Sequence, residues 1–168
     1  DEFRAWNSLI ERGATTHDVA FRFGVPERTV QQRMKLGRLA EEVLSSYDEG
    51  DIDLDVLKVF TITDDQERQR AVLKQVRRGY MVHASHVKRL LTEDQISSAS
   101  KLGVFVGLDA YEDADGDVSR DLFSDHDEGF MTDVALVHRL AEEKLEKRAA
   151  ELASSWKWVE IVPEMDYG

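Results

Sequence analysis

The stretch from Thr15 to Leu36, TTHDVAFRFGVPERTVQQRMKL, has the pattern of two short helices joined by a tight turn. Thr15 or Thr16 can cap the first helix, because a hydroxyl at that position accepts a hydrogen bond from the first helical turn. Gly24 stands where a left-handed residue commonly ends a helix, and Pro26 stands where a new helix can begin without losing a hydrogen bond. The stretch therefore predicts a helix, a corner and a second helix.

Ala20, Gly24 and Val30 fall at the small, turn and core positions of a DNA-reading helix-turn-helix. This spacing can also arise by chance, so an ordinary helical hairpin in a bundle is the alternative. Two features favour DNA reading. The second helix carries Arg and Gln, which suit base edges and phosphates. From Arg22 to Ala40, five basic residues stand against one acidic residue, whereas the whole chain has a formal net charge of −12.

Composition limits the class of protein. The chain has 168 residues, of which 42% are hydrophobic, which fits one domain or a small domain with an appendage. It contains no cysteine, which excludes disulfides and agrees with a reducing cytoplasm, so we expect a cytoplasmic protein. No run of apolar residues approaches the length of a membrane span, so no membrane partner is expected. Because the chain begins at Asp1 without Met, we expect a fragment of a longer protein.

The remainder of residues 1–101 is predicted to be helical, because apolar residues recur at three- and four-residue spacing between short turns. We expect these segments to form one helical DNA-binding domain with the helix-turn-helix. The predicted helices are Asp1–Arg12, Leu39–Tyr47, Leu54–Phe60, Thr63–Arg78 and Ser85–Leu91.

Residues 102–168 differ in character and are predicted to form an acidic α+β appendage. Val104–Val106 and Trp156–Val162 have the composition of short strands that could pair, with Trp156 and Trp158 in the core. Asp133–Leu152 has the period of a long helix. Asp109 to Glu146 contains thirteen acidic residues against three basic ones. A DNA-binding protein built this way must direct its acidic part away from the duplex.

Five stretches carry a resemblance to a known family: DEFRAWNSLIERG, DVAFRFGVPERTVQQRMKLGRL, EEVLSSYDEGDIDLDVLKVFTITDDQERQ, FVGLDAYEDADGDVSRDLF and SWKWVEIVPE. With these stretches in this order and spacing, the chain resembles the ParB/KorB family of plasmid and chromosome partition proteins, and most of all its long plasmid-borne ParB-like branch. The resemblance implies a mainly α fold: a multi-helix KorB/ParB-like helix-turn-helix domain with a small α+β C-terminal appendage.

The resemblance also implies a function, which is binding to a centromere-like site on double-stranded DNA, with a homodimer and a partition ATPase as further partners to consider. Family members carry a CTP-binding domain with an Arg-rich signature ahead of the helix-turn-helix. This chain contains no such signature, so nucleotide binding is not carried over and we expect no cofactor. We expect no enzymatic activity.

The second helix supplies the candidate DNA contacts. Arg28, Gln31 and Gln32 are predicted to read bases, because Arg can bond guanine and Gln can bond adenine through two hydrogen bonds each. The alternative is a solvated helix face. Residues expected to contact phosphates are Thr15, Thr16, Arg22, Thr29, Arg33, Lys35 and Arg38. Later helices also touch DNA in such proteins, and the basic positions that correspond here are Arg77, Arg78, His83, His86, Lys88 and Arg89.

Two other functions remain open from the sequence. The acidic C-terminal part could instead serve as a protein-interaction module for a basic partner. A metal-dependent nuclease is the weaker hypothesis, because no spacing of carboxylates supports a metal site. His83 and His86 could bind a metal on a helix, but no third ligand stands nearby, so we predict no metal. The acidic turn Asp113–Asp117 also fails as a calcium loop, since Tyr111 and Leu122 would occupy ligand positions.

Overall fold

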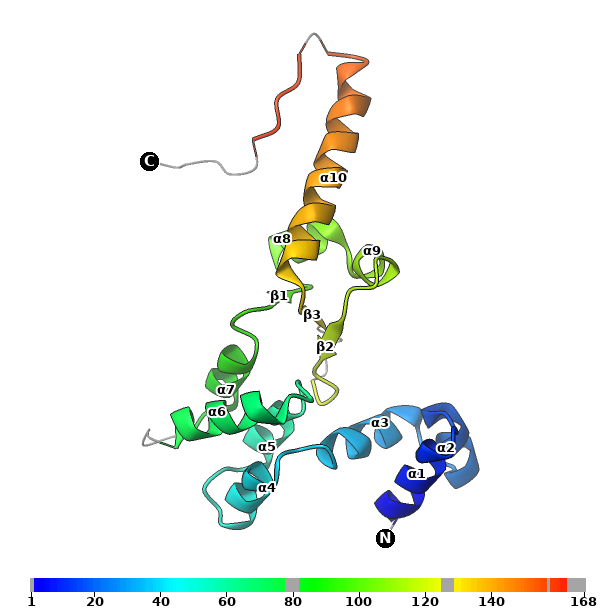
Figure 1. The fold of residues 1–168 in the computed structure, drawn as a ribbon, viewed down its shortest axis with the longest axis vertical. Helices are drawn as coiled ribbons and strands as arrows, with labels where there is room; N and C mark the ends of the chain where they lie inside the picture. Colours follow the sequence, from blue (N-terminus) through cyan, green and yellow to red (C-terminus); the bar gives the residue numbers. More distant parts are fainter. Residues whose placement is uncertain (1, 78–81, 125–128, 157, 163–168) are drawn as a thin grey trace. The chain divides into compact units, whose positions relative to one another are not determined.

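The computed structural model describes residues 2–77, 82–124, 129–156 and 158–162. It is mainly helical with a small three-stranded sheet, which confirms the mainly α prediction (Figure 1). The chain forms two compact units. The first contains Asp1–Glu93 and Ser119–Glu128, and the second contains Asp94–Val118 and Gly129–Gly168. The sequence placed a single boundary near Leu102 and gave no sign that a later segment belongs to the first unit.

The first unit is built from helices, as predicted. α1, α2 and α3 contact one another, and α4, α5, α6 and α7 pack against each other in the same unit (Figure 1). The helices are α1 (Glu2–Glu11), α2 (Thr16–Phe23), α3 (Glu27–Leu36), α4 (Glu41–Asp48), α5 (Leu54–Phe60), α6 (Gln66–Val76) and α7 (Ala84–Leu91).

The predicted helix-turn-helix is present as α2 and α3. Thr15 is the cap of α2: its hydroxyl accepts from the Asp18 N–H, and the Asp18 carboxylate accepts from the Thr15 N–H at 2.9 Å. That backbone bond, followed by the bond from the Thr15 hydroxyl, lowers the pKa of Asp18. Gly24 ends α2 in the left-handed region, with φ 66° and ψ 32°. A core of Trp6, Val19, Ala20, Val30 and Met34 then joins the three helices.

A buried glutamine connects this motif to the rest of the first unit. The Gln69 side chain is 1% exposed on α6. Its Oε1 accepts from the Ala40 N–H at 2.7 Å, just ahead of α4, and its Nε2 donates to the carbonyls of Phe60 at 3.3 Å and Thr63 at 2.8 Å. One amide therefore fixes the chain after α3 against the connection between α5 and α6.

The helix α6 begins later than the sequence suggested. Thr63 and Gln66 have the form of a capping box, but Asp65 is the cap, and its carboxylate accepts from the N–H groups of Glu67 and Arg68. The Thr63 hydroxyl accepts from the Asp65 N–H at 3.1 Å instead. The predicted C-terminal end at Arg78 lies outside the described residues.

The second unit combines a small sheet with helices. β3 lies between β1 and β2, and it pairs antiparallel with β1, with Ile96 opposite Met131 and Ser97 opposite Phe130. The core contains Val106, Tyr111, Met131, Leu136, Val137 and Ala141. Its elements are β1 (Ile96–Ser97), α8 (Lys101–Val106), α9 (Leu108–Asp113), β3 (Gly129–Met131) and α10 (Val134–Ala153), together with the start of β2 (Val118–Arg120).

The long helix predicted over Asp133–Leu152 is confirmed as α10, whereas both strand predictions for this region are wrong. Val104–Val106 is the end of α8, because the Ser100 hydroxyl caps that helix by accepting from the Gly103 N–H at 3.0 Å. The Val104 side chain is 68% exposed, so the apolar run is not a buried strand.

The described part of Trp156–Val162 contains no strand. Trp156 and Trp158 are 68% and 75% exposed, so their assignment to the core is also wrong. The sheet obtains its strands from segments for which no strand was predicted: Ile96–Ser97 lies in the part expected to be helical, and the other two strands are Val118–Arg120 and Gly129–Met131. An alternating apolar pattern predicts a strand only where a partner edge is available.

We predict that Gly24→Ala lowers the free energy of unfolding by about 1–2 kcal/mol, the cost of a left-handed backbone for a residue with a Cβ. An added Cβ would meet no atom within 4 Å, so crowding makes no contribution. Gly37→Ala is the matched control, because Gly37 has φ −70° and ψ −11°, which alanine adopts readily. Urea unfolding, monitored by circular dichroism, measures the free energy of unfolding of both variants. Equal losses at the two positions would contradict the backbone explanation.

We predict that Gln69→Leu lowers the free energy of unfolding by about 2–4 kcal/mol, because it leaves the buried Ala40 N–H and two carbonyls without their partner. Gln75→Leu is the control on the same helix, since Gln75 is exposed, and it should change stability by less than about 0.5 kcal/mol. The same urea titration compares them. A tolerated Gln69→Leu would show that the amide network is dispensable.

Candidate functional site

The helix α3 is the candidate site, because its two faces are chemically distinct. Val30 and Met34, four residues apart, are buried in the core of the helix-turn-helix. The remaining surface carries polar side chains that the sequence analysis assigned to DNA, of which Arg28 is exposed and Gln31 and Gln32 are partly exposed. The placement of this face follows from the Gly24 corner, which sets the direction in which α3 leaves α2.

Two of the three predicted base readers are bonded to a turn of the same unit. The Arg28 guanidinium donates from Nε to the Leu122 carbonyl at 3.2 Å and from an Nη to the Ser124 carbonyl at 2.5 Å. The Gln32 amide donates to the same Leu122 carbonyl at 2.6 Å. No sequence pattern predicts this contact, because 90 to 96 residues separate the partners in the chain.

Asp121 holds this turn in its conformation. Its carboxylate accepts from the N–H groups of Phe123 and Ser124, both at 3.1 Å, which closes the turn locally. The other carboxylate oxygen lies 3.2 Å from the Lys88 ammonium on α7. The Asp121 side chain is only 9% exposed. Asp121 therefore couples the shape of the turn to a charge on a neighbouring helix.

The third predicted reader, Gln31, lies beside an acidic residue of its own helix. Its amide is 3.5 Å from Glu27 Oε1, at the limit for a hydrogen bond. Glu27 has closer partners: it accepts from the Thr16 hydroxyl at 2.6 Å, and its other oxygen lies 3.6 Å from His17. Glu27 thereby links the start of α3 to the start of α2, and Thr16 has a structural contact at this corner.

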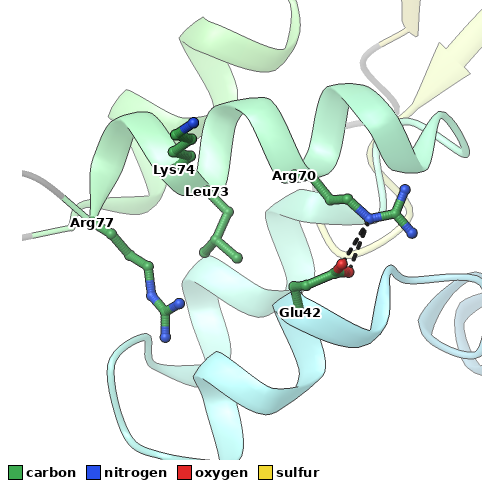
Figure 2. Close-up of a pocket in the computed structure, with 5 residues that line it drawn as sticks. All are labelled: Glu42, Arg70, Leu73, Lys74 and Arg77. Atoms are coloured by element: carbon green, nitrogen blue, oxygen red, sulfur yellow. Dashed lines mark hydrogen bonds and ion pairs between the residues drawn. The ribbon is translucent and has the colours of Figure 1, made fainter.

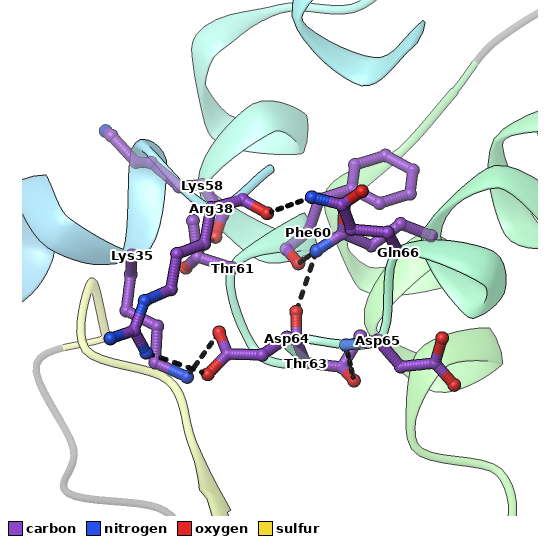
Figure 3. Close-up of polar contacts among 10 residues, drawn as sticks. Lys35, Arg38, Lys58, Phe60, Thr61, Thr63, Asp64, Asp65 and Gln66 are labelled. Atoms are coloured by element: carbon purple, nitrogen blue, oxygen red, sulfur yellow. Dashed lines mark hydrogen bonds and ion pairs between the residues drawn. The ribbon is translucent and has the colours of Figure 1, made fainter. Parts of the chain in front are cut away.

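Lys35 and Arg38, both predicted phosphate contacts, converge on one carboxylate (Figure 3). Asp64 lies 2.9 Å from the Lys35 ammonium and 3.2 Å from the Arg38 guanidinium. The Gln66 side chain also donates to the Arg38 carbonyl at 3.1 Å. The Asp64 side chain is 45% exposed, so water screens these pairs and they contribute little to stability.

The other predicted phosphate contacts differ from one another. Arg33 lies over the Trp6 ring, with 5.2 Å from the guanidinium carbon to the ring centre, so it packs back over the motif. Thr15 is committed to capping α2. Among the described residues, the side chains of Arg22 and Thr29 make no hydrogen bond or ion pair.

The secondary basic positions that the structure describes have different partners. Arg77 lies 2.5 Å from Asp51 and 3.3 Å from Glu49, and the hydrogen bond that Arg77 donates to the Asp51 carboxylate is the main cause that raises the pKa of Arg77. Arg89 lies 3.1 Å from His86 Nδ1. His83 precedes α7 without a side-chain capping bond, and Arg78 lies outside the described residues.

Arg77 also lines a pocket between α4 and α6, together with Glu42, Arg70, Leu73 and Lys74 (Figure 2). The Arg70 Nε lies 3.0 Å from both Glu42 carboxylate oxygens. The pKa of Glu42 is lowered first by its own backbone N–H and then by Arg70. The described carboxylates thus already neutralise Arg70 and Arg77 at this pocket, which makes it a weaker anion site than its basic residues suggest.

Within the described ranges, no three histidine or acidic side chains are placed to hold a metal ion. No helix in the described part of the chain is both long enough and apolar enough to cross a bilayer.

Comparison with known proteins gives two relatives. The chain is 28% identical over 164 residues to the uncharacterized protein YubM of Escherichia coli O157:H7, and 27% identical over 164 residues to YubM of Escherichia coli strain K12. Each alignment covers 94% of this chain and 25% of the relative, so the chain spans about a quarter of the length of these curated relatives. No family model and no solved structure matches the chain. The names of the relatives state no ligand or activity.

Proposed function

We propose that this chain binds double-stranded DNA at specific sequences through α2 and α3, as the DNA-binding part of a KorB/ParB-like plasmid or chromosome partition protein. The observation that carries the proposal is the geometry of the motif. Gly24 forms the left-handed corner between two short helices, and with Val30 buried, Arg28, Gln31 and Gln32 lie on the other side of α3. A recognition helix in the major groove requires this arrangement.

The charge distribution supports the same proposal. Arg22, Arg28, Lys35 and Arg38 place positive charge along α2, α3 and the residues just after them, in a chain that is acidic as a whole. Association with phosphates releases counterions, which favours binding through such a local basic surface. The carboxylates of the second unit must then be kept away from the duplex. A homodimer on an inverted repeat and a partition ATPase are the partners that the family resemblance adds to this proposal.

Selection of bound sequences from random duplex DNA tests the proposal. We expect one preferred sequence, and we expect Arg28→Ala, Gln31→Ala and Gln32→Ala each to reduce the preference for it over scrambled DNA. A lost bidentate base contact costs about 1–3 kcal/mol of discrimination, which is about five- to hundredfold in relative affinity. Fluorescence anisotropy with both duplexes measures this ratio.

Lys35→Ala should behave differently, weakening binding to all sequences alike and reducing the slope of log affinity against log salt by about 1. Lys101→Ala, at an exposed position of α8, is the control and should change neither quantity. If the alanine variants at Arg28, Gln31 and Gln32 keep the wild-type preference, the assignment of the readers is wrong. If selection yields no enriched sequence, specific DNA binding is rejected.

A second candidate function is protein binding by the acidic C-terminal unit, and one observation favours it. Trp156 and Trp158 are largely exposed in the C-terminal part of the second unit, and exposed aromatic side chains are typical anchors of protein interfaces. We expect the double variant Trp156→Ala/Trp158→Ala to weaken binding of a partition ATPase about tenfold or more in calorimetry. Phe21→Ala is the control, because Phe21 is 86% exposed in the first unit. Equal affinities of wild type and double variant would reject this candidate.

A further inference from the structure

We infer that the turn Asp121–Ser124 is an autoinhibitory element that competes with DNA for Arg28 and Gln32. The inference rests on the proposed DNA-binding function and concerns the regulation of the same site. It starts from the finding that both side chains are already bonded to the turn, at 2.5 to 3.2 Å.

The turn presents the same hydrogen-bonding pattern as a base edge. Guanine offers two acceptors to a guanidinium in the major groove. The carbonyls of Leu122 and Ser124 likewise offer two acceptors to the Nε and Nη groups of Arg28. The Gln32 amide, which would donate to a base acceptor, donates to the Leu122 carbonyl instead. A duplex that is to use these donors must displace the turn.

The charge of the turn argues against the opposite role, in which it would contact DNA beside α3. Asp121–Ser124 contains one carboxylate and no cation, so its net charge opposes the approach of a phosphate. Displacing the turn therefore makes two donors of α3, those of Arg28 and Gln32, available to DNA.

The competition is expected to be partial and not complete. Arg28 remains exposed, so its bonds to the turn form in contact with water and have a modest net free energy. The Asp121 side chain, by contrast, is 9% exposed and holds the turn through two backbone N–H groups and Lys88. Asp121 is consequently the residue at which the turn can be released without altering α3.

Asp121→Ala tests the inference in the full chain. The probe is a labelled random-sequence duplex pool, titrated at fixed salt and followed by fluorescence anisotropy. We expect Asp121→Ala to bind at least about fivefold more tightly than wild type, the lower end of coupling between competing interactions. Asp121→Asn keeps the oxygen that accepts from the turn but removes the charge facing Lys88, and it should give a smaller gain. Thermal unfolding establishes that both variants fold.

Two controls separate release of the turn from the loss of one negative charge. Asp48→Ala removes an exposed carboxylate of α4 and should leave the affinity within about twofold of wild type. Asp121→Ala is also introduced into Arg28→Ala/Gln32→Ala. If the turn acts through these two side chains, the gain disappears in that background, whereas a general charge effect persists.

The outcomes distinguish this inference from the proposed function. Binding by wild type with no gain in Asp121→Ala, weaker binding, or a gain that survives in Arg28→Ala/Gln32→Ala overturns the autoinhibitory role and leaves DNA binding in place. Failure of the folded wild type and of all variants to bind the pool overturns both. A gain of the expected size that requires Arg28 and Gln32 supports both.

Discussion

One buried amide in the first unit joins segments that lie far apart in the sequence. Gln69 accepts from the Ala40 N–H and donates to the carbonyls of Phe60 and Thr63, so it joins the segment after α3 to the connection between α5 and α6. A buried polar group is costly unless all its partners are present, so this network specifies one arrangement of the chain.

That arrangement also brings the polar face of α3 within reach of the chain's own acceptors. Asp64, near the end of the connection fixed by Gln69, faces Lys35 and Arg38, and the carbonyls of Leu122 and Ser124 face Arg28. Most of the donors that make α3 a candidate DNA surface are therefore satisfied within the protein. A duplex would have to replace these internal partners. The affinity for DNA therefore depends on the difference in free energy between the internal contacts and the DNA contacts, and not on the number of basic residues alone.

Local signals explain why much of the first unit could be predicted. Thr15 caps α2, Gly24 ends it and Val30 with Met34 defines the inner face of α3, and each of these effects acts within four residues along the chain. The strand predictions for the second unit failed, because a strand forms only where it pairs with another strand. Val104–Val106 became helical because Ser100 caps it, and the segment with Trp156 and Trp158 remained outside the sheet because other strands flank β3.

The sequence by itself determined the helix-turn-helix, the helical character of the first unit and the long α10, because hydrophobic period, caps and left-handed glycine positions act over short distances. Tertiary structure alone decided that Ser119–Glu128 belongs to the first unit, and that a turn within it occupies Arg28 and Gln32. Contacts between residues so far apart depend on how packed elements meet, and no local pattern in Asp121–Ser124 encodes its partner.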